Sequence, residues 1–273
     1  MSDAAFRYRE IAPPPALQSY VQCIWRMSGA AQADVPPEPI IPDGCAELVL
    51  NFGDAFIRHT ADGSHHQPLR LVAGQITQAV TIQPSGRIDL WGVRFHPWSA
   101  APFLGFSGTE MRHRLVSVDD LSTSLERSLS DIADARSEQA QFDMIVARLL
   151  RRVGAARPMD SRVRRLSQLV AARREPFTVR ALARYAGLSV RRVQLLFRDD
   201  VGLSPKQMHR IHRYQCALAI HRAHPRLTWS AVAARAGYHD HAHLIHESHD
   251  IAGRTPSRLM GDARELTDAF LPE

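Results

Sequence analysis

The chain has 273 residues, with 34 Lys and Arg against 28 Asp and Glu and a formal net charge of +6. This length suffices for two domains with cores of their own. The cysteines Cys23, Cys45 and Cys216 are odd in number and widely spaced, which excludes a disulfide framework. The sequence shows neither a signal-peptide pattern nor an apolar run of about 18 residues, so it predicts a cytoplasmic protein outside any membrane.

Residues 1–117 have the pattern of a β-rich domain. Short segments rich in branched and aromatic residues occur at 20–27, 46–52, 69–73, 79–83 and 87–95. Turn clusters such as Pro36-Pro37-Glu38-Pro39 and Pro42-Asp43-Gly44 separate them, which predicts a small barrel or sandwich. The apolar alternation of the last segment changes phase around Gly92, and this predicts a β-bulge there.

Residues 118–157 change to helical spacing and predict a helical connector and linker. Apolar residues recur at Leu121, Leu125, Leu129 and Ile132, and again between residues 142 and 150. The seam of Leu121, Leu125 and Leu129 fits a dimer interface, a signal relay or packing on the chain's own barrel equally well. Residues 154–158 are the expected inter-domain linker.

The positive charge is concentrated in the C-terminal part of the chain. Residues 1–159 carry 15 Arg against 17 Asp and Glu, a net charge of −2, whereas residues 160–273 carry 19 Lys and Arg against 11 Asp and Glu, a net charge of +8. Such a basic segment is typical of a surface that binds phosphates, although a solvated charged face has the same composition.

A short pattern occurs twice in this basic segment. Ala183-Arg184-Tyr185-Ala186-Gly187-Leu188-Ser189 and Ala233-Ala234-Arg235-Ala236-Gly237-Tyr238-His239-Asp240 each run from small helical residues through Ala-Gly to a helix N-cap residue. This is the pattern of two helices joined by a tight turn, and it predicts helix-turn-helix units at about 178–199 and 228–250. Residues 205–224 form a long helix between them, and residues 263–273 form a C-terminal tail.

These residues together resemble the AraC/XylS family of bacterial transcription regulators over residues 158–262. The motifs that carry the resemblance are Ala183-x-x-Ala186-Gly187-Leu188-Ser189, Phe197, Gly202-Leu203-Ser204-Pro205, Ala233-x-x-Ala236-Gly237-Tyr238 and Gly253-x-Thr255-Pro256. The resemblance implies an all-α DNA-binding domain with two helix-turn-helix units. It also implies an α+β chain of two domains, because residues 41–49 and 92–97 resemble the β-rich domain of one subgroup. Related domains are cupin-like barrels that bind small-molecule effectors and can form dimers.

The resemblance also implies which side chains meet DNA. On the first recognition helix, Arg191, Gln194 and Leu195 occupy positions that face the groove, while Arg192 and Arg198 are expected to meet phosphates. Arginine pairs with guanine and glutamine with adenine, each good pair giving about 1–3 kcal/mol of discrimination. Solubility alone is the competing explanation for these arginines.

The second recognition helix departs from the family pattern. Its outer face is expected to present His241, Ala242, Ile245 and His246, with His241 where Gln is common and His246 where Arg is common. Ser248 stands where an aromatic core residue is usual, which predicts a loss of about 1.5–3 kcal/mol of apolar burial and a looser second unit. We therefore expect the first helix to provide most of the base recognition.

The histidines also allow two other interpretations, a metal site and an enzyme. His239, His243, His246 and His249 lie near one helical stripe, but no Cys or paired carboxylate completes a zinc set. In the N-terminal domain the histidines are scattered and do not match a two-His-plus-carboxylate oxygenase site. We therefore expect no metal, no cofactor and no catalytic residue. The alternative is a metal- or ligand-dependent activity in the barrel, with DNA binding secondary.

An effector-binding pocket is expected in the N-terminal domain. Trp25, Trp91, Arg94 and His96 are its candidate lining residues, although ordinary core packing explains the tryptophans as well. The sequence thus predicts a helix-turn-helix, DNA-binding protein that regulates transcription. Its expected partners are operator DNA in the nucleoid, RNA polymerase, a small-molecule effector and a second copy of the chain.

Overall fold

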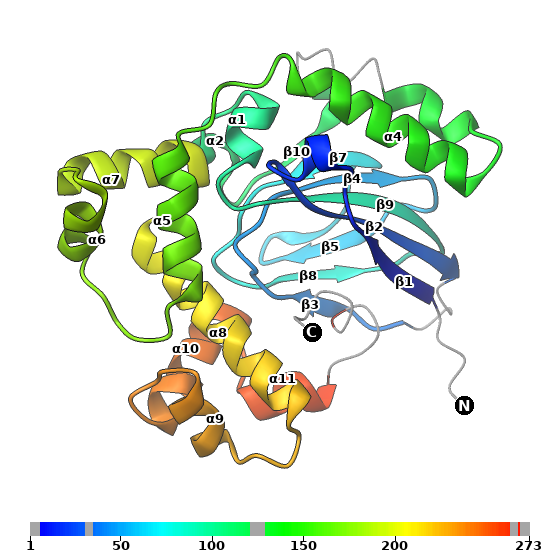
Figure 1. Ribbon diagram of the computed structural model, residues 1–273. Helices are drawn as coiled ribbons and strands as arrows, with labels where there is room; N and C mark the ends of the chain where they lie inside the picture. Colours follow the sequence, from blue (N-terminus) through cyan, green and yellow to red (C-terminus); the bar gives the residue numbers. More distant parts are fainter. Residues whose placement is uncertain (1–5, 31–34, 121–128, 263–266, 268–273) are drawn as a thin grey trace.

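The computed structural model describes residues 6–30, 35–120, 129–262 and 267. It shows a β-sandwich with a long helix packed on one face and a group of helices beside it (Figure 1). This confirms the α+β class, with a β-rich N-terminal part and a helical C-terminal part. In the part of the chain described, none of the helices is long and apolar enough to cross a membrane.

The sandwich consists of two antiparallel sheets. The larger sheet has the order β1-β2-β9-β4-β7-β10, and the smaller has the order β3-β8-β5-β6. Their strands are β1 (Phe6–Ile11), β2 (Val21–Ala30), β3 (Glu38–Ile40), β4 (Glu47–Asn51), β5 (Ile57–Thr60), β6 (Gly63–His66), β7 (Arg70–Ala73), β8 (Val80–Gln83), β9 (Arg87–Phe95) and β10 (Leu115–Ser117).

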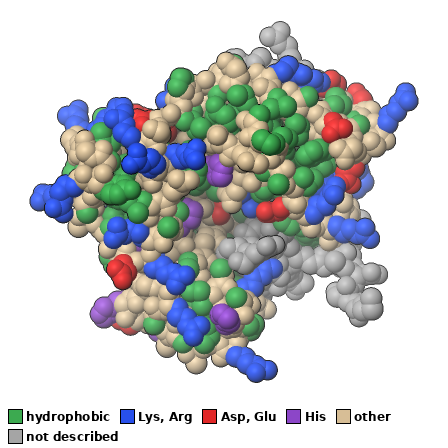
Figure 2. All heavy atoms as spheres, in the orientation of Figure 1, with side chains coloured by type: hydrophobic (Ala, Val, Ile, Leu, Met, Phe, Trp, Pro, Cys, Tyr) green, Lys and Arg blue, Asp and Glu red, His purple; other side chains and the backbone are tan. Residues whose placement is uncertain are grey.

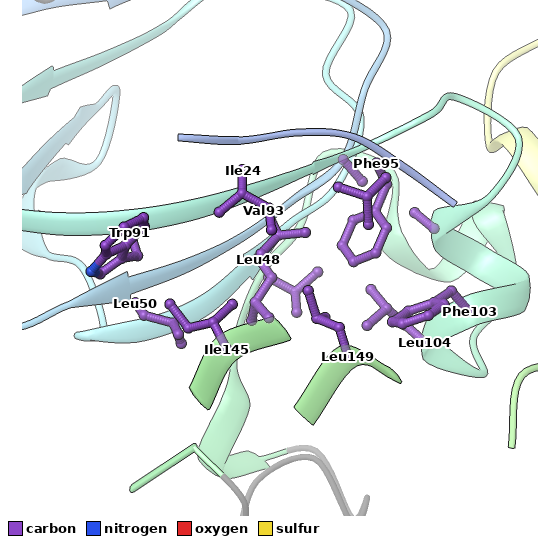
Figure 3. Close-up of a cluster of buried hydrophobic side chains, with 14 of the residues drawn as sticks. Ile24, Leu48, Leu50, Trp91, Val93, Phe95, Phe103, Leu104, Ile145 and Leu149 are labelled. Atoms are coloured by element: carbon purple, nitrogen blue, oxygen red, sulfur yellow. The ribbon is translucent and has the colours of Figure 1, made fainter. Parts of the chain in front are cut away.

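Both faces of the larger sheet are buried. On its outer face, Trp91 and Val93 of β9 pack toward Leu149 of α4 (Glu138–Val153), as Figure 3 shows. On its inner face, Met27 and Leu90 pack between the two sheets. A strand buried on both faces carries apolar residues at consecutive positions.

The β-bulge expected at Gly92 is therefore wrong. β9 pairs with β4 without interruption from Arg94 to Leu90. The register shift lies on β2 instead, between Val21 and Cys23. Gly92 has a different role, because the indole of Trp25 lies across it and would overlap with a Cβ atom.

Several short elements were not expected from the sequence. They include β1, β5, β6, β10 and the short helices α1 (Ala100–Leu104) and α2 (Gly108–Met111). The turn expected at residues 36–39 is only partly correct, because β3 begins at Glu38 and contains Pro39. β3 is an edge strand, where a proline without an N–H group is tolerated.

The connector is only partly helical. The 3-10 turns η2 (Val118–Asp120) and η3 (Ser130–Asp134) precede α4. Leu121 and Leu125 of the expected seam lie outside the described residues, while Leu129 and Ile132 are buried in the core under the large sheet. Leu129 therefore packs on the sandwich of its own chain.

The C-terminal part consists of α5 (Ser161–Ala172), α6 (Val179–Ala186), α7 (Val190–Leu196), the π-helical turn η4 (Phe197–Val201), α8 (Pro205–Ala223), α9 (Trp229–Arg235), α10 (His241–Ala252) and α11 (Pro256–Asp262). The predicted N-caps Ser189 and Asp240 are confirmed, since each side chain accepts a hydrogen bond from the first turn that follows. Thr178 and Thr228 cap α6 and α9 in the same way. α8 joins two separate apolar cores, contributing Ile211 to one and Leu218 to the other.

Candidate DNA interface and sandwich cavity

Each helix-turn-helix turns at a glycine with a positive φ. Gly187 ends α6 at φ 63°, and Gly237 follows α9 at φ 78°. This left-handed conformation favours glycine. At Gly237 there is also no room for a side chain, because a Cβ would press on the Arg174 carbonyl. The repeated Ala-Gly pattern thus fixes the angle at which α7 and α10 leave their supporting helices.

α7 presents its polar side chains to solvent. Arg191, Arg192, Gln194 and Arg198 are exposed and Leu195 is half-buried. Val193 and Leu196 point into the core on the other side. In the view of Figure 2, Lys and Arg side chains crowd the end of the molecule that carries α6 and α7. The polar side chains expected to meet DNA are therefore exposed to solvent.

α10 presents a weaker surface of the same kind. Ala242 and His246 are exposed, while His241 and Ile245 are half-buried. Nε2 of His246 lies 3.9 Å from an Asp250 carboxylate oxygen. This helix therefore offers no permanently positive side chain at the four positions expected to face the groove.

A buried ion network lies beneath α10 and was not expected from the sequence. The Glu247 carboxylate is 3% exposed. It accepts hydrogen bonds from Nη2 of Arg213 at 2.8 Å and Nε of Arg210 at 3.0 Å, and from the Tyr238 hydroxyl at 2.8 Å. The Arg213 guanidinium also lies over the Tyr238 ring, 4.3 Å from its centroid. The available signal was a glutamate three residues after Leu244, on the buried stripe of the helix.

Ser248 does not leave α10 loosely packed. Its side chain is fully buried, 2.8 Å from the Tyr214 hydroxyl of α8, and it donates a hydrogen bond to the Arg254 carbonyl at 2.7 Å. The predicted loss of apolar burial is replaced by satisfied hydrogen bonds, so the argument for a looser second unit is wrong on this point.

The histidines in and just before α10 have separate partners. Nδ1 of His239 lies 3.0 Å from Asp240, and the His243 ring meets the Tyr238 ring edge-on at 5.2 Å. Within the described residues, no group of three or more His, Cys, Asp or Glu side chains is placed to hold a metal ion.

The N-terminal domain holds both recognition helices at their C-terminal ends. Behind α7, the Thr109 hydroxyl donates to the Arg198 carbonyl at 3.1 Å, and Gly108 touches Gly202 so closely that neither has room for a Cβ. At the end of α10, the Ala79 amide donates to the Ile251 carbonyl at 2.7 Å. The placement of the two helices is thus tied to the sandwich.

The turn of residues 42–44 rests on the bridging helix α8. Nε2 of Gln215 donates to the buried Pro42 carbonyl at 2.6 Å. Gly44, at φ 83°, packs against the His212 ring. Ile41, which precedes this turn, belongs to the same apolar core as Leu218 of α8. Residues 41–44 therefore join the sandwich to the helix that carries both helix-turn-helix units.

A cavity of about 140 Å³ lies between the two sheets. Its walls are mainly apolar and include Trp25, Ile41, Phe56 and Leu90, and Asp43, Cys45, Glu47 and Arg58 also line it. Ile41 and Asp43 thus face the cavity from the segment that rests on α8.

The structure separates the four residues expected to form a pocket. Trp25 lines the cavity. Trp91 lies on the opposite face of the sheet, where its indole N–H donates to Gln141 at 2.9 Å. His96 is stacked on Trp98 with ring centroids 4.7 Å apart. Arg94 is buried behind the lining residues, and the sequence did not indicate the cavity residues of the smaller sheet.

Arg94 holds three carboxylates together. Its Nε lies 2.7 Å from Glu47 and 3.4 Å from Asp43, and Nη1 lies 3.0 Å from Glu10. Burial raises the pKa of Glu47, and the Arg94 guanidinium opposes that rise. Burial also raises the pKa of the Cys45 thiol well above its ordinary value, and Asp43 adds to this effect, which disfavours the reactive thiolate form.

Comparisons with known protein families match two segments of the chain. A family described as a helix-turn-helix domain matches residues 182–261, which contain α7 to α10. A domain of unknown function, DUF6597, matches residues 9–117, which contain the sandwich. No curated protein matches the chain.

Solved structures resemble the chain as well. A probable AraC family transcriptional regulator from Rhodopseudomonas palustris is 25% identical over 38% of this chain and 99% of its own, with a TM-score of 0.34. ToxT from Vibrio cholerae is 8% identical over 94% of this chain and 98% of its own, with a TM-score of 0.50. ToxT bound to an unsaturated fatty acid is 8% identical over 95% of this chain and 97% of its own, with a TM-score of 0.48.

Proposed function

We propose that the chain is a DNA-binding transcription regulator of the AraC type, in which α7 and α10 read two successive major-groove segments of one operator. The match of residues 182–261 to a helix-turn-helix domain supports this proposal. The observation that carries this proposal is the solvent-facing polar side of α7, opposite its buried core residues. α8 supports both units and fixes their separation.

Base recognition is assigned mainly to α7. Arg191 and Gln194 have side chains able to make bidentate contacts to guanine and adenine, and Leu195 is assigned to a thymine methyl group. Arg192 and Arg198 contact phosphates and set the register. On α10, His241, Ala242, Ile245 and His246 contact the second segment and contribute less to the affinity.

The N-terminal domain is the effector-binding part in this proposal. The cavity between the sheets has the apolar walls and few polar groups typical of small-molecule sites. Ile41 and Asp43 line it, and the same segment holds α8 through Pro42 and Gly44. A ligand that moves this segment therefore changes how α8 presents the two recognition helices.

In this proposal the regulator is a cytoplasmic protein and acts on DNA in the nucleoid. RNA polymerase is its partner at the promoter, and a second copy of the chain pairs with the first. The chain acts by binding, with no catalytic residue, metal or cofactor of its own.

Selection of binding sites from random duplex DNA tests the function directly. The wild-type protein should enrich one motif that spans two major-groove segments, and Arg191→Ala should relax the preference at one or two positions of it. Arg136→Ala, at an exposed arginine of the connector, is the matched control and should enrich the wild-type motif. Equal recovery of all sequences by the wild-type protein would contradict the proposal.

A further inference from the structure

Arg58 is an arginine that lines the cavity. It lies on β5 opposite Ile82 of β8, and both residues line the cavity. The side chain is half-buried, and its Nε is buried with no hydrogen-bond partner. Among the residues that the structure describes, the Arg58 side chain forms neither a hydrogen bond nor an ion pair. Because its Nε is buried without a partner, an anionic group placed beside this guanidinium would supply the missing acceptor.

The opposite sheet presents an excess of negative charge. Glu47 and Asp43 line the cavity, and they share the guanidinium of Arg94 with Glu10. Three carboxylates therefore surround one arginine. On Glu47, both donors, Nε of Arg94 and the indole N–H of Trp25, meet the same oxygen, Oε1. This end of the cavity has acceptor capacity for a cation.

The two charged ends do not neutralise each other. Arg58 is not within ion-pair distance of Glu47 or Asp43, although all three line one cavity. His113 and Arg114 also line it, but both are exposed and their charge is screened by water. A molecule placed between Arg58 and the two carboxylates would pair both signs at once.

The space between these ends is apolar and small. Val49, Phe56 and Ile82 lie on its walls. Its volume of about 140 Å³ is close to that of an engineered cavity, about 150 Å³, that accommodates benzene. A ligand of this size has one branched or aromatic hydrocarbon group.

We propose that the cavity binds a compact zwitterion, with one carboxylate for Arg58, one ammonium for Glu47 and Asp43, and an apolar side group, as in the apolar amino acids. This inference rests on the effector role of the N-terminal domain in the proposed function. Asp43 connects the ligand to the turn on α8, so the ammonium end is the one that the DNA-binding domain senses.

Calorimetric titration of the full chain with a matched series tests the ligand class. Leucine, valine and phenylalanine are the zwitterions. For leucine, 4-methylpentanoate lacks only the amino group and 3-methylbutylamine lacks only the carboxylate. At least one amino acid should bind, and leucine should bind about tenfold or more tightly than either of its singly charged analogues.

Two variants assign the two ends of the ligand. In Arg58→Met, leucine and 3-methylbutylamine should bind equally well, because the carboxylate has lost its partner. In Glu47→Gln, the advantage of leucine over 4-methylpentanoate should fall by about tenfold. Arg7→Gln, an exposed arginine of β1, should behave as wild type. If Glu47→Gln loses the native circular dichroism spectrum, Asp43→Asn takes its place.

The inference is overturned if none of the amino acids binds, or if one singly charged analogue binds as tightly as leucine. The same samples are assayed for DNA binding without ligand. Retained DNA binding beside absent ligand binding rejects only the zwitterion, whereas absent sequence preference in the DNA assay rejects the proposed function itself.

Discussion

Removing the buried charge of Glu247 is the sharpest test of how α10 is held. In Glu247→Gln the carboxylate becomes a neutral amide of nearly the same shape, while Arg213, 6% exposed, stays buried. Arg213 lies 2.8 Å from Glu247 and has no other carboxylate partner among the residues that the structure describes. The substitution therefore leaves an uncompensated charge in the core between α8 and α10.

The expected cost follows from the three contacts of Glu247. Breaking a buried ion pair by removing one partner costs about 3–5 kcal/mol. The bond from Arg210, whose side chain is 44% exposed, adds at most about 1 kcal/mol. The Tyr238 hydroxyl keeps an acceptor in the amide oxygen. Because these contacts form one network and are not additive, we expect a total of about 3–5 kcal/mol.

Urea unfolding, followed by circular dichroism, measures this cost. Asp250→Asn is the matched control, because Asp250 pairs with Arg210 at the surface and should lose no more than about 1 kcal/mol. The double variant Glu247→Leu with Arg213→Met should recover much of the loss, since it removes both charges. A loss below about 1 kcal/mol in Glu247→Gln would refute the claim that this network holds α10.

Three further predictions concern the contacts between the domains. Gly202→Ala should lower the free energy of unfolding by about 1–3 kcal/mol, because Gly202 has φ 81° and a Cβ would overlap with Gly108; an unchanged urea midpoint would contradict this. Gln215→Ala should cost about 1–3 kcal/mol in the same assay, because it leaves the Pro42 carbonyl buried without its donor; a cost near zero would argue against the clamp on α8. Burial lowers the pKa of His212 from its ordinary value of 6.5, although Asp43 opposes this, so folding favours the neutral imidazole. This contribution to stability is present above pH 6.5 and is lost as the pH falls below that value. Between about pH 7.5 and pH 5.5, the free energy of unfolding should therefore fall less in His212→Gln than in the wild type. An equal fall in both proteins would refute this role of His212.

The helical half was largely predictable because its signals are local. An N-cap side chain, a helical run and a glycine with positive φ lie within a few residues of one another, so Thr178, Gly187 and Ser189 define one unit without knowledge of the rest. The exposed face of α7 followed from the same periodicity.

The sandwich was less predictable because its pattern depends on both faces. β9 is apolar on each side, and the sequence could not show that one side meets α4 and the other meets Trp25. The same limit applied to the cavity. Trp25 and Trp91 are both tryptophans in apolar strands, but only the pairing of the strands puts them on opposite faces.

The long-range contacts could not be predicted from the sequence. Glu247 meets Arg213 across 34 residues, and Gln215 meets Pro42 across 173. Neither pair has a local signal, because a buried charge resembles a surface charge until its partner is placed. The first contact joins α10 to α8, and the second joins α8 to the segment beside the cavity.

A hydroxyl-radical footprint on a selected binding site tests the central claim most directly. Two protected segments are expected, about one helical turn or 34 Å apart, on one face of the duplex. Arg191→Ala should weaken the segment under α7 and leave the other, while His246→Ala should do the reverse. A single protected segment, or protection that both variants reduce equally along its length, would contradict the assignment of α7 and α10 to successive major grooves.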